Sequence, residues 1–429
     1  MEFKIKEAFE IKTKDNKKYQ GVIIDEKPNK IVLKLDSGYN VGIFKKNIKE
    51  MKHKTMSQNL KASSDKQKKP TQNKNLPELI LIHTGGTIAS RVNYKTGGVS
   101  ALFEPEEIIS LFPELGQIAR LDSRVVSNML SENVRFSHIN KIVDTIKDSL
   151  KSKPKGIIVT HGTDTLHYVA AALSFLIEHP PVPIILVGSQ RSSDRPSSDS
   201  KYNLLSAANF ALKSGAKGVF ISFHEKSSEE KCVILKGVNS RKMHTSRRDA
   251  FKPINTEPVA YVDLNNYGIH WVSKRGNFDA KGKTKFRKFK SNLKMGMIYV
   301  HPSITKEEIG VISKLDGAII LGTGLGHIGL EDENSFVLDE FKKAIKKGTI
   351  LAMAPQTIFG RINLNIYSTG RQLKEMGVLG HECSMTPETA FIKLAYLLSN
   401  FKKEEIPELY HTDLRGELSD RIEYIEEYV

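Results

Sequence analysis

Two short stretches of small and hydroxyl-bearing residues each follow an apolar run. HTGGTIAS (residues 83–90) follows LILI, and THGTDTLH (residues 160–167) follows GIIV. A threonine hydroxyl becomes a nucleophile when a neighbouring base or charge activates it. Threonines also cap helices and stabilise turns, and glycine-rich turns can cradle phosphate. Thr87, Thr163 and Asp164 are therefore candidates for chemistry, with capping and turn roles as the alternative.

The common cofactor motifs do not account for these turns. A P-loop needs a lysine after its glycines, and none follows residues 85–86. GTGLGHIG (residues 322–329) has the glycine spacing of a dinucleotide site, but the next strand lacks the acidic residue that holds a ribose. We therefore interpret it as a turn that lets the backbone pack closely. HExxH, CxxC and G-x-S-x-G are absent too, so we expect no cofactor and no metal in this chain.

Buried strands alternating with helices would position the candidate threonines. Segments with helical spacing, such as residues 166–177, lie between several short apolar runs. These runs occupy residues 79–82, 157–159, 183–187, 218–222, 296–300, 317–321 and 348–354. The alternation predicts an α/β fold with mostly parallel sheets in two lobes. Ligands bind at the carboxyl edge of such a sheet, so both turns are expected at one edge.

The amino-terminal part differs in composition. Residues 1–77 contain 19 Lys and 9 acidic residues in a chain of formal charge +16. Short β segments predict a small β-barrel of the SH3 or Sm type over residues 1–51, and the polar, lysine-rich residues 52–76 predict a flexible linker. The first lobe is then expected over residues 77–272, and the second over 295–429.

A second basic run, residues 273–294, is expected to connect the lobes. It carries nine Lys or Arg against one Asp. Clustered positive charge suits an anionic partner such as nucleic acid, while a solvated linker is the alternative. The sequence shows no signal core and no apolar run of membrane-spanning length, and its two cysteines give no disulfide framework. These features predict a cytoplasmic protein with no membrane contact.

TGGTIA (residues 84–89) and HGTDT (residues 161–165) together resemble the two signature motifs of the L-asparaginase family of amidohydrolases. RKMHTSRRDAF (residues 241–251) resembles that family's lysine motif, and the similarity extends from about residue 77 to 417. The resemblance implies that Thr87 attacks a side-chain amide carbonyl. It also implies that Thr163, Asp164 and Lys242 form the supporting relay.

The same resemblance suggests substrate-binding residues. Ser127 matches a residue that holds the substrate's α-carboxylate, and Asn128 stands where a glutamine is often found. Gly86 lies in a turn whose backbone N–H groups are candidate oxyanion donors. Tyr94, in RVNYKTGG, matches the mobile lid of the family; an exposed loop aromatic is the alternative.

Residues 1–76, the stretches SENV and ASRVNY, and the tail YHTDLRGELSDRIEYIEEYV are similar to the D subunits of archaeal glutamyl-tRNA(Gln) amidotransferases. That resemblance implies a glutaminase whose ammonia passes to an E subunit, which uses ATP and Mg to amidate glutamate on tRNA(Gln). It further implies a homodimer of this chain at the core of a heterotetramer of two D and two E subunits.

Two alternatives stay open. One is a free L-asparaginase with an added domain, although a free asparaginase has no need of a basic barrel. The other is a non-enzymatic RNA-binding or scaffold protein on a decayed amidohydrolase fold. The four catalytic positions, Thr87 and the three residues of the relay, all hold the expected residue types, which argues against decay.

Overall fold

A computed structural model describes residues 8–35, 40–53, 72–86, 88, 90–92, 99–101, 105–193, 197–274, 278 and 282–422. The chain divides into a small unit, Met1–Thr71, and a large unit, Gln72–Val429. The helices within the described ranges are all too short or too polar to cross a membrane.

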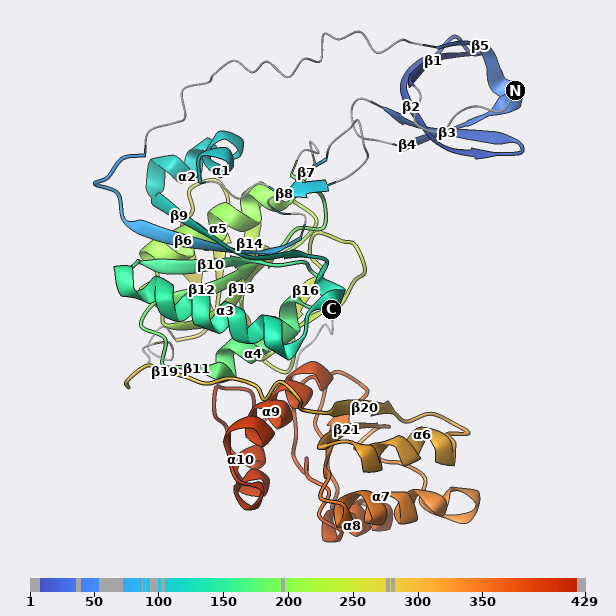
Figure 1. Ribbon diagram of the computed structural model, residues 1–429, viewed down its shortest axis with the longest axis vertical. Helices are drawn as coiled ribbons and strands as arrows, with labels where there is room; N and C mark the ends of the chain where they lie inside the picture. Colours follow the sequence, from blue (N-terminus) through green and yellow to red (C-terminus); the bar gives the residue numbers. More distant parts are fainter. Residues whose placement is uncertain are drawn as a thin grey trace. The chain divides into compact units, whose positions relative to one another are not determined.

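The small unit is a five-stranded antiparallel sheet with the strand order β4-β3-β2-β1-β5 (Figure 1). Its strands are β1 (Ala8–Thr13), β2 (Lys18–Lys27), β3 (Lys30–Leu35), β4 (Asn40–Phe44) and β5 (Ile48–His53). Its core consists of the buried side chains of Phe9, Ile11, Ile23, Ile31, Leu33 and Ile43. The predicted β domain is thus confirmed. Closure into a barrel stays a prediction, because no pairing joins β4 to β5 within the described residues.

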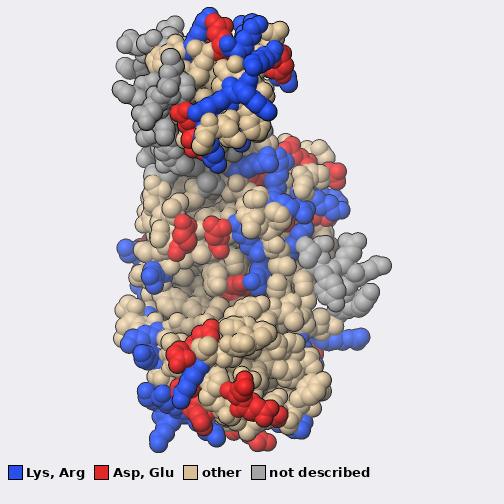
Figure 2. Space-filling model, turned by 90° about the vertical axis from the view of Figure 1, so that its right-hand side faces the viewer, with Lys and Arg blue, Asp and Glu red and all other residues tan. Residues whose placement is uncertain are grey.

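Lysines of the small unit stand beside acidic residues on the face that Figure 2 shows. Lys17 pairs with Asp15 at 3.1 Å, and Lys52 pairs with Glu50 at 2.9 Å. Such exposed pairs contribute little to stability, but they break up the positive surface. Much of the predicted linker, residues 54–71, lies outside the described residues. Gln72 already belongs to the large unit, because its side-chain amide hydrogen-bonds to both backbone groups of Leu121.

The first lobe of the large unit is built on an eight-stranded sheet with the order β18-β17-β14-β13-β12-β10-β6-β9. The neighbouring strands β9, β6, β10, β12 and β13 are parallel to one another. Beyond β13, the strands β14, β17 and β18 continue the sheet with antiparallel pairing. Its strands are β6 (Glu78–Gly85), β9 (Arg120–Met129), β10 (Gly156–Thr160), β12 (Pro183–Val187), β13 (Gly218–His224), β14 (Lys231–Lys236), β17 (Ala260–Asp263) and β18 (Ile269–Trp271).

Helices cover both faces of this sheet (Figure 1). One face packs on α3 (Phe136–Ser149) and α4 (Leu166–Leu176). The other face packs on α1 (Pro105–Leu111), α2 (Pro113–Ile118) and α5 (Ser200–Lys213). Along β10 the alternation is direct: Ile157 and Val159 belong to the α3/α4 core, and Ile158 belongs to the other core. Burial on both faces explains why β10 is a continuous apolar run.

Short strand pairs complete the first lobe and its connections. The pair β15 (Ser240–Lys242) and β16 (Phe251–Pro253) and the pair β7 (Ser90–Val92) and β8 (Val99–Ala101) are hairpin-like. A third pair joins β11 (Ile177–Glu178) to β19 (Lys285–Phe286), which lies in the second basic run. Arg287 of that run contacts Glu178 at 2.7 Å, and Lys288 contacts Asp144 at 2.7 Å. Part of the positive charge of this basic run is therefore paired with acidic residues of the same chain.

The second lobe has a three-stranded parallel sheet, β20-β21-β22, with helices around it. Its elements are β20 (Met295–Tyr299), β21 (Gly317–Gly322), β22 (Ile350–Pro355), α6 (Lys306–Gly310), α7 (Phe336–Lys346), α8 (Ser368–Glu375), α9 (Pro387–Asn400) and α10 (Ile406–His411). The observed α/β architecture of two lobes agrees with the sequence-based prediction.

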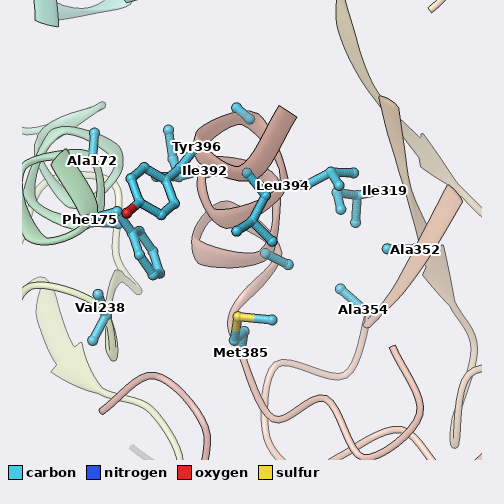
Figure 3. Packing of buried hydrophobic residues seen from close by; sticks show 14 of the residues in the cluster. Ala172, Phe175, Val238, Ile319, Ala352, Ala354, Met385, Ile392, Leu394 and Tyr396 are labelled. Carbon is cyan, nitrogen blue, oxygen red and sulfur yellow. The ribbon is translucent and has the colours of Figure 1, made fainter. Parts of the chain in front are cut away.

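Helix α9 joins the two lobes. Figure 3 shows Tyr396 of α9 against Phe175 of α4 on one side, and Leu394 directed toward Ile319 of β21 on the other. The rings of Phe175 and Tyr396 stack with their centroids 5.5 Å apart. Thr386 caps the start of α9 by accepting the N–H of Thr389, and Pro387 follows at the first helical position.

The glycine-rich turn after β21 packs as the sequence suggested. A Cβ on Gly322 would lie 2.7 Å from the Cα of Gly326, and a Cβ on Gly326 would lie 2.8 Å from the side chain of Ile362. Gly326 also has φ +100°, a backbone conformation that favours glycine. Close backbone approach therefore explains these glycines.

Candidate active site

Adjacent parallel strands bring the two hydroxyl-rich turns to one edge of the large sheet. In the register of β6 and β10, His83 is the partner of Thr160. Beyond Thr160 the chain forms a turn over residues 161–165 and then enters α4. Because both strands run in the same direction, their carboxyl ends lie side by side. The expected meeting of the two turns is thus observed.

Lys242 reaches the second turn from β15. Its Nζ donates to Oγ1 of Thr163 at 2.8 Å and lies 2.7 Å from Oδ1 of Asp164. The Lys242 side chain is 9% exposed, while that of Asp164 is 65% exposed. One ammonium therefore links the hydroxyl and the carboxylate of neighbouring residues, with the carboxylate facing solvent. The three relay residues that the structure describes are in direct contact.

Hydrogen bonds between Thr84 and the second turn hold the two turns together. Thr84 Oγ1 lies 2.5 Å from Nδ1 of His161 and donates to the carbonyl of Thr160 at 2.8 Å. The other ring nitrogen of His161 lies 3.0 Å from Oγ1 of Thr165. That hydroxyl donates onward to the carbonyl of Ser131 at 2.9 Å. This buried chain fixes the geometry from which Thr163 and Asp164 project.

Burial keeps the histidines of this edge neutral. Burial lowers the pKa of His161 to about 4, with the charge of His167 adding to the effect, and burial lowers the pKa of His83 to about 4. A neutral imidazole has one donor and one acceptor nitrogen. The neutral ring of His161 therefore donates at one of its two threonine contacts and accepts at the other. Both rings therefore act as uncharged hydrogen-bonding groups at neutral pH.

Glycines allow the turns to approach at backbone distance. A Cβ on Gly86 would lie 2.8 Å from the backbone nitrogen of Gly162, and Gly86 has φ +88°. A Cβ on Gly162 would in turn lie 2.7 Å from the Cβ of Ser131. Neither position could hold a larger residue without displacing backbone or a packed side chain. The amides of Gly86 and Gly162 thus lie near one another at the site.

The predicted substrate-binding residues are placed in part. Ser127 lies on β9 and donates its hydroxyl to the carbonyl of Thr84 at 2.9 Å, which puts it at the same edge. Asn128 follows it on the same strand. Thr87 and Tyr94 lie outside the described residues. Their roles stay predictions, as do the substrate contacts of Ser127, Asn128 and Gly86.

Sequence reasoning missed the parts played by Thr84 and His161. Both residues stand in the quoted motifs, but the sequence suggests roles there only for Gly86, Thr87, Thr163 and Asp164. A signal was present, because each missed residue lies at or just beyond the end of a buried strand, where the motif begins. Polar groups at such positions need partners when buried, and these two residues satisfy one another.

Comparisons with known proteins agree with this geometry. Residues 78–275 match the family model for the asparaginase N-terminal domain, and residues 294–409 match the glutaminase/asparaginase C-terminal domain. Residues 3–52 match the GatD N-terminal domain. Among solved structures, the thermostable L-asparaginase from Thermococcus kodakarensis is 28% identical with a TM-score of 0.71, covering 80% of this chain and 100% of that chain. L-asparaginase I from Vibrio cholerae is 27% identical with a TM-score of 0.65, covering 80% of this chain and 99% of that one.

Curated relatives match most of the chain, including the small unit. One is the D subunit of the glutamyl-tRNA(Gln) amidotransferase of Saccharolobus islandicus, which is 39% identical over 91% of this chain and 86% of its own length. Another is the D subunit of the same enzyme of Methanococcus maripaludis, which is 39% identical over 95% of this chain and 96% of its own. With its asparaginase-like lobes and its amino-terminal β domain, the chain belongs to the family of glutamyl-tRNA(Gln) amidotransferase D subunits.

Proposed function

We propose that this chain is the glutaminase of a tRNA-dependent amidotransferase. It hydrolyses glutamine to glutamate and ammonia, and the ammonia serves to convert glutamyl-tRNA(Gln) to glutaminyl-tRNA(Gln). The observation that carries the proposal is the contact of Lys242 with both Thr163 and Asp164 at the edge where the two turns meet. The names of the relatives and the match of the small unit support the tRNA-dependent reaction over a free amidase.

The proposed chemistry has two stages. The Thr87 hydroxyl adds to the amide carbonyl of glutamine, the carbon–nitrogen bond breaks, and the nitrogen leaves as ammonia with the proton that Thr87 gave up. Water then hydrolyses the γ-glutamyl ester, which releases glutamate and restores Thr87. In both stages the relay of Thr163, Asp164 and Lys242 moves the proton, because a hydroxyl needs a base chain at neutral pH.

The charges suit this task. The Lys242 ammonium pairs with the carboxylate of Asp164 at 2.7 Å, and a carboxylate is a group that can accept a proton. Because Lys242 donates to Oγ1 of Thr163, the hydroxyl hydrogen of Thr163 is directed elsewhere and can bridge to the reacting group. Backbone amides in the turns of Gly86 and Gly162 are proposed to stabilise the oxyanion.

The proposed partners follow from the family. The chain is proposed to form a homodimer at the core of a heterotetramer of two D and two E subunits, with ATP and Mg used on the E subunit and tRNA(Gln) bound by the assembly. Of the residues that the structure describes, no group of three or more His, Cys, Asp or Glu side chains is placed to hold a metal ion. The proposed glutaminase step uses side chains, backbone amides and water.

Ammonia release from glutamine and from asparagine tests the proposal. The purified chain is assayed alone, then with the E subunit, and then with glutamyl-tRNA(Gln) added. We expect weak activity alone and a rise of about tenfold or more for glutamine in the full mixture, because binding energy can drive a closure that assembles a catalytic site. Rapid asparagine hydrolysis that neither addition changes would instead indicate a free L-asparaginase.

A further inference from the structure

A buried carboxylate from the second lobe lies directly behind the relay. Glu388, in the first turn of α9, is 6% exposed. Its Oε1 lies 3.2 Å from Nη2 of Arg241 and 3.8 Å from Nε2 of His167. Arg241 immediately precedes Lys242 on β15, and His167 is the second residue of α4. Glu388 therefore contacts the two segments that carry the relay.

Lys242 stands at the end of a short strand. β15 has three residues and pairs only with the three-residue β16 within the described part of the chain. Helix α9, by contrast, is held on both sides by the cores of the two lobes (Figure 3). The contact of Glu388 with Arg241 thus connects a three-residue strand to a helix that both lobes hold. Side chains that must hold a catalytic geometry are best fixed by such supporting contacts.

Glu388 keeps its charge despite burial. Burial raises the pKa of this carboxyl group, but the hydrogen bond and charge of His167 and the charge of Arg241 outweigh it, and the net pKa is lowered. Oε2 of Glu388 has no hydrogen-bond partner among the described residues. A buried ion pair is weak evidence for stability, because apolar replacements often serve as well. A role in positioning explains this charged group better.

We propose that Glu388 is a positioning residue that holds Arg241, and through it β15, so that Lys242 reaches Thr163 and Asp164. This inference rests on the proposed glutaminase function and adds that the second lobe takes part in the same site. Separation of α9 from β15 would move the Lys242 ammonium out of the relay. A shift of one lobe relative to the other would then change the catalytic rate, although no contact with bound substrate would change.

The variant Glu388→Gln tests the inference, with Glu340→Gln as a matched control. Glu340 is 5% exposed and also pairs with a basic residue, Lys343, at 3.2 Å, but it lies on α7 away from the relay. For Glu388→Gln we expect kcat for ammonia release to fall about 100-fold, the loss that a displacement of about 1 Å at a catalytic group can cause. KM should stay within about twofold, because no substrate contact is lost. Glu340→Gln should leave both constants unchanged.

A second background separates positioning from general destabilisation. If Glu388 acts through Lys242, Glu388→Gln should cause no further loss of kcat in a protein that already carries Lys242→Met. An equal loss in both backgrounds would overturn the proposal. Where Glu388→Gln does not fold, the double variant Glu388→Gln with Arg241→Gln removes both charges and leaves neither unpaired. It should show the same fall in kcat.

A crystal structure of the variant distinguishes failure of this inference from failure of the proposed function. If the unaltered protein releases no ammonia from glutamine or asparagine even in the full complex, the proposed function fails. The inference then still predicts that Lys242 Nζ lies beyond hydrogen-bond distance, about 3.5 Å, from Thr163 Oγ1 in Glu388→Gln. A distance unchanged from 2.8 Å would overturn it.

Discussion

The variant Thr87→Ala is expected to lose about 10⁴-fold or more of kcat for ammonia release from glutamine, since removal of a nucleophile abolishes covalent catalysis. Alanine has no hydroxyl to add to the amide carbonyl, so no γ-glutamyl ester can form. Steady-state ammonia release by the complex with the E subunit measures the effect. KM and tRNA binding are expected to change much less, because the loss concerns the reacting group.

Two further variants make this result specific. Thr87→Ser keeps a hydroxyl and should retain measurable activity. Thr145→Ala removes a hydroxyl on α3 that donates to the carbonyl of Lys141, and it should match the unaltered protein. If Thr87→Ala hydrolysed glutamine at the parent rate, Thr87 would not be the nucleophile.

The variant Lys242→Met is expected to reduce kcat about 10³-fold, within the range that acid–base groups contribute. Methionine keeps the apolar stem of a 9% exposed side chain but removes the ammonium that contacts Thr163 and Asp164. Asp164 then loses its charge partner, and the proton path through Thr163 is broken. Kinetics with glutamine, together with thermal unfolding, separate loss of catalysis from loss of fold.

Lys236→Met is the matched control for this variant. Lys236 ends β14 and is half-buried, and burial lowers its pKa. Lys236 precedes the loop that leads from β14 into β15. It is not one of the relay residues. Its replacement should leave kcat within about twofold of the parent value, because Lys236 is not among the catalytic or substrate-binding residues. Unaltered kinetics in Lys242→Met would refute the role of Lys242, whatever the control shows.

The sequence predicted the positions of the two turns well. The run at residues 79–82 lies in β6 and the run at 157–159 lies in β10, and both are fully buried. Continuous apolar runs are typical of strands that are covered on both faces. The helix expected over residues 166–177 is α4, which ends at Leu176. The antiparallel extension through β14, β17 and β18 was not predicted, because periodicity reports burial and not the direction of pairing.

Contacts between distant residues could not be read from local patterns. Lys242 meets Thr163 and Asp164 from a separate strand pair, and only the family resemblance pointed to it. Glu388 meets Arg241 from another lobe, and its position in a helix start is equally explained by the macrodipole, which favours acids there. Local sequence records propensity and burial, whereas these pairings depend on how α9 packs between the lobes.

The central claim is that Thr87 attacks the glutamine amide at the meeting of the two turns. Rapid acid quench of the complex during turnover, followed by mass analysis of its peptides, tests that claim most directly. We expect a γ-glutamyl ester on the peptide that contains Thr87, and no such ester in Thr87→Ala. Ammonia release at the full rate with no ester on that peptide, or with the ester on Thr163, would contradict the account.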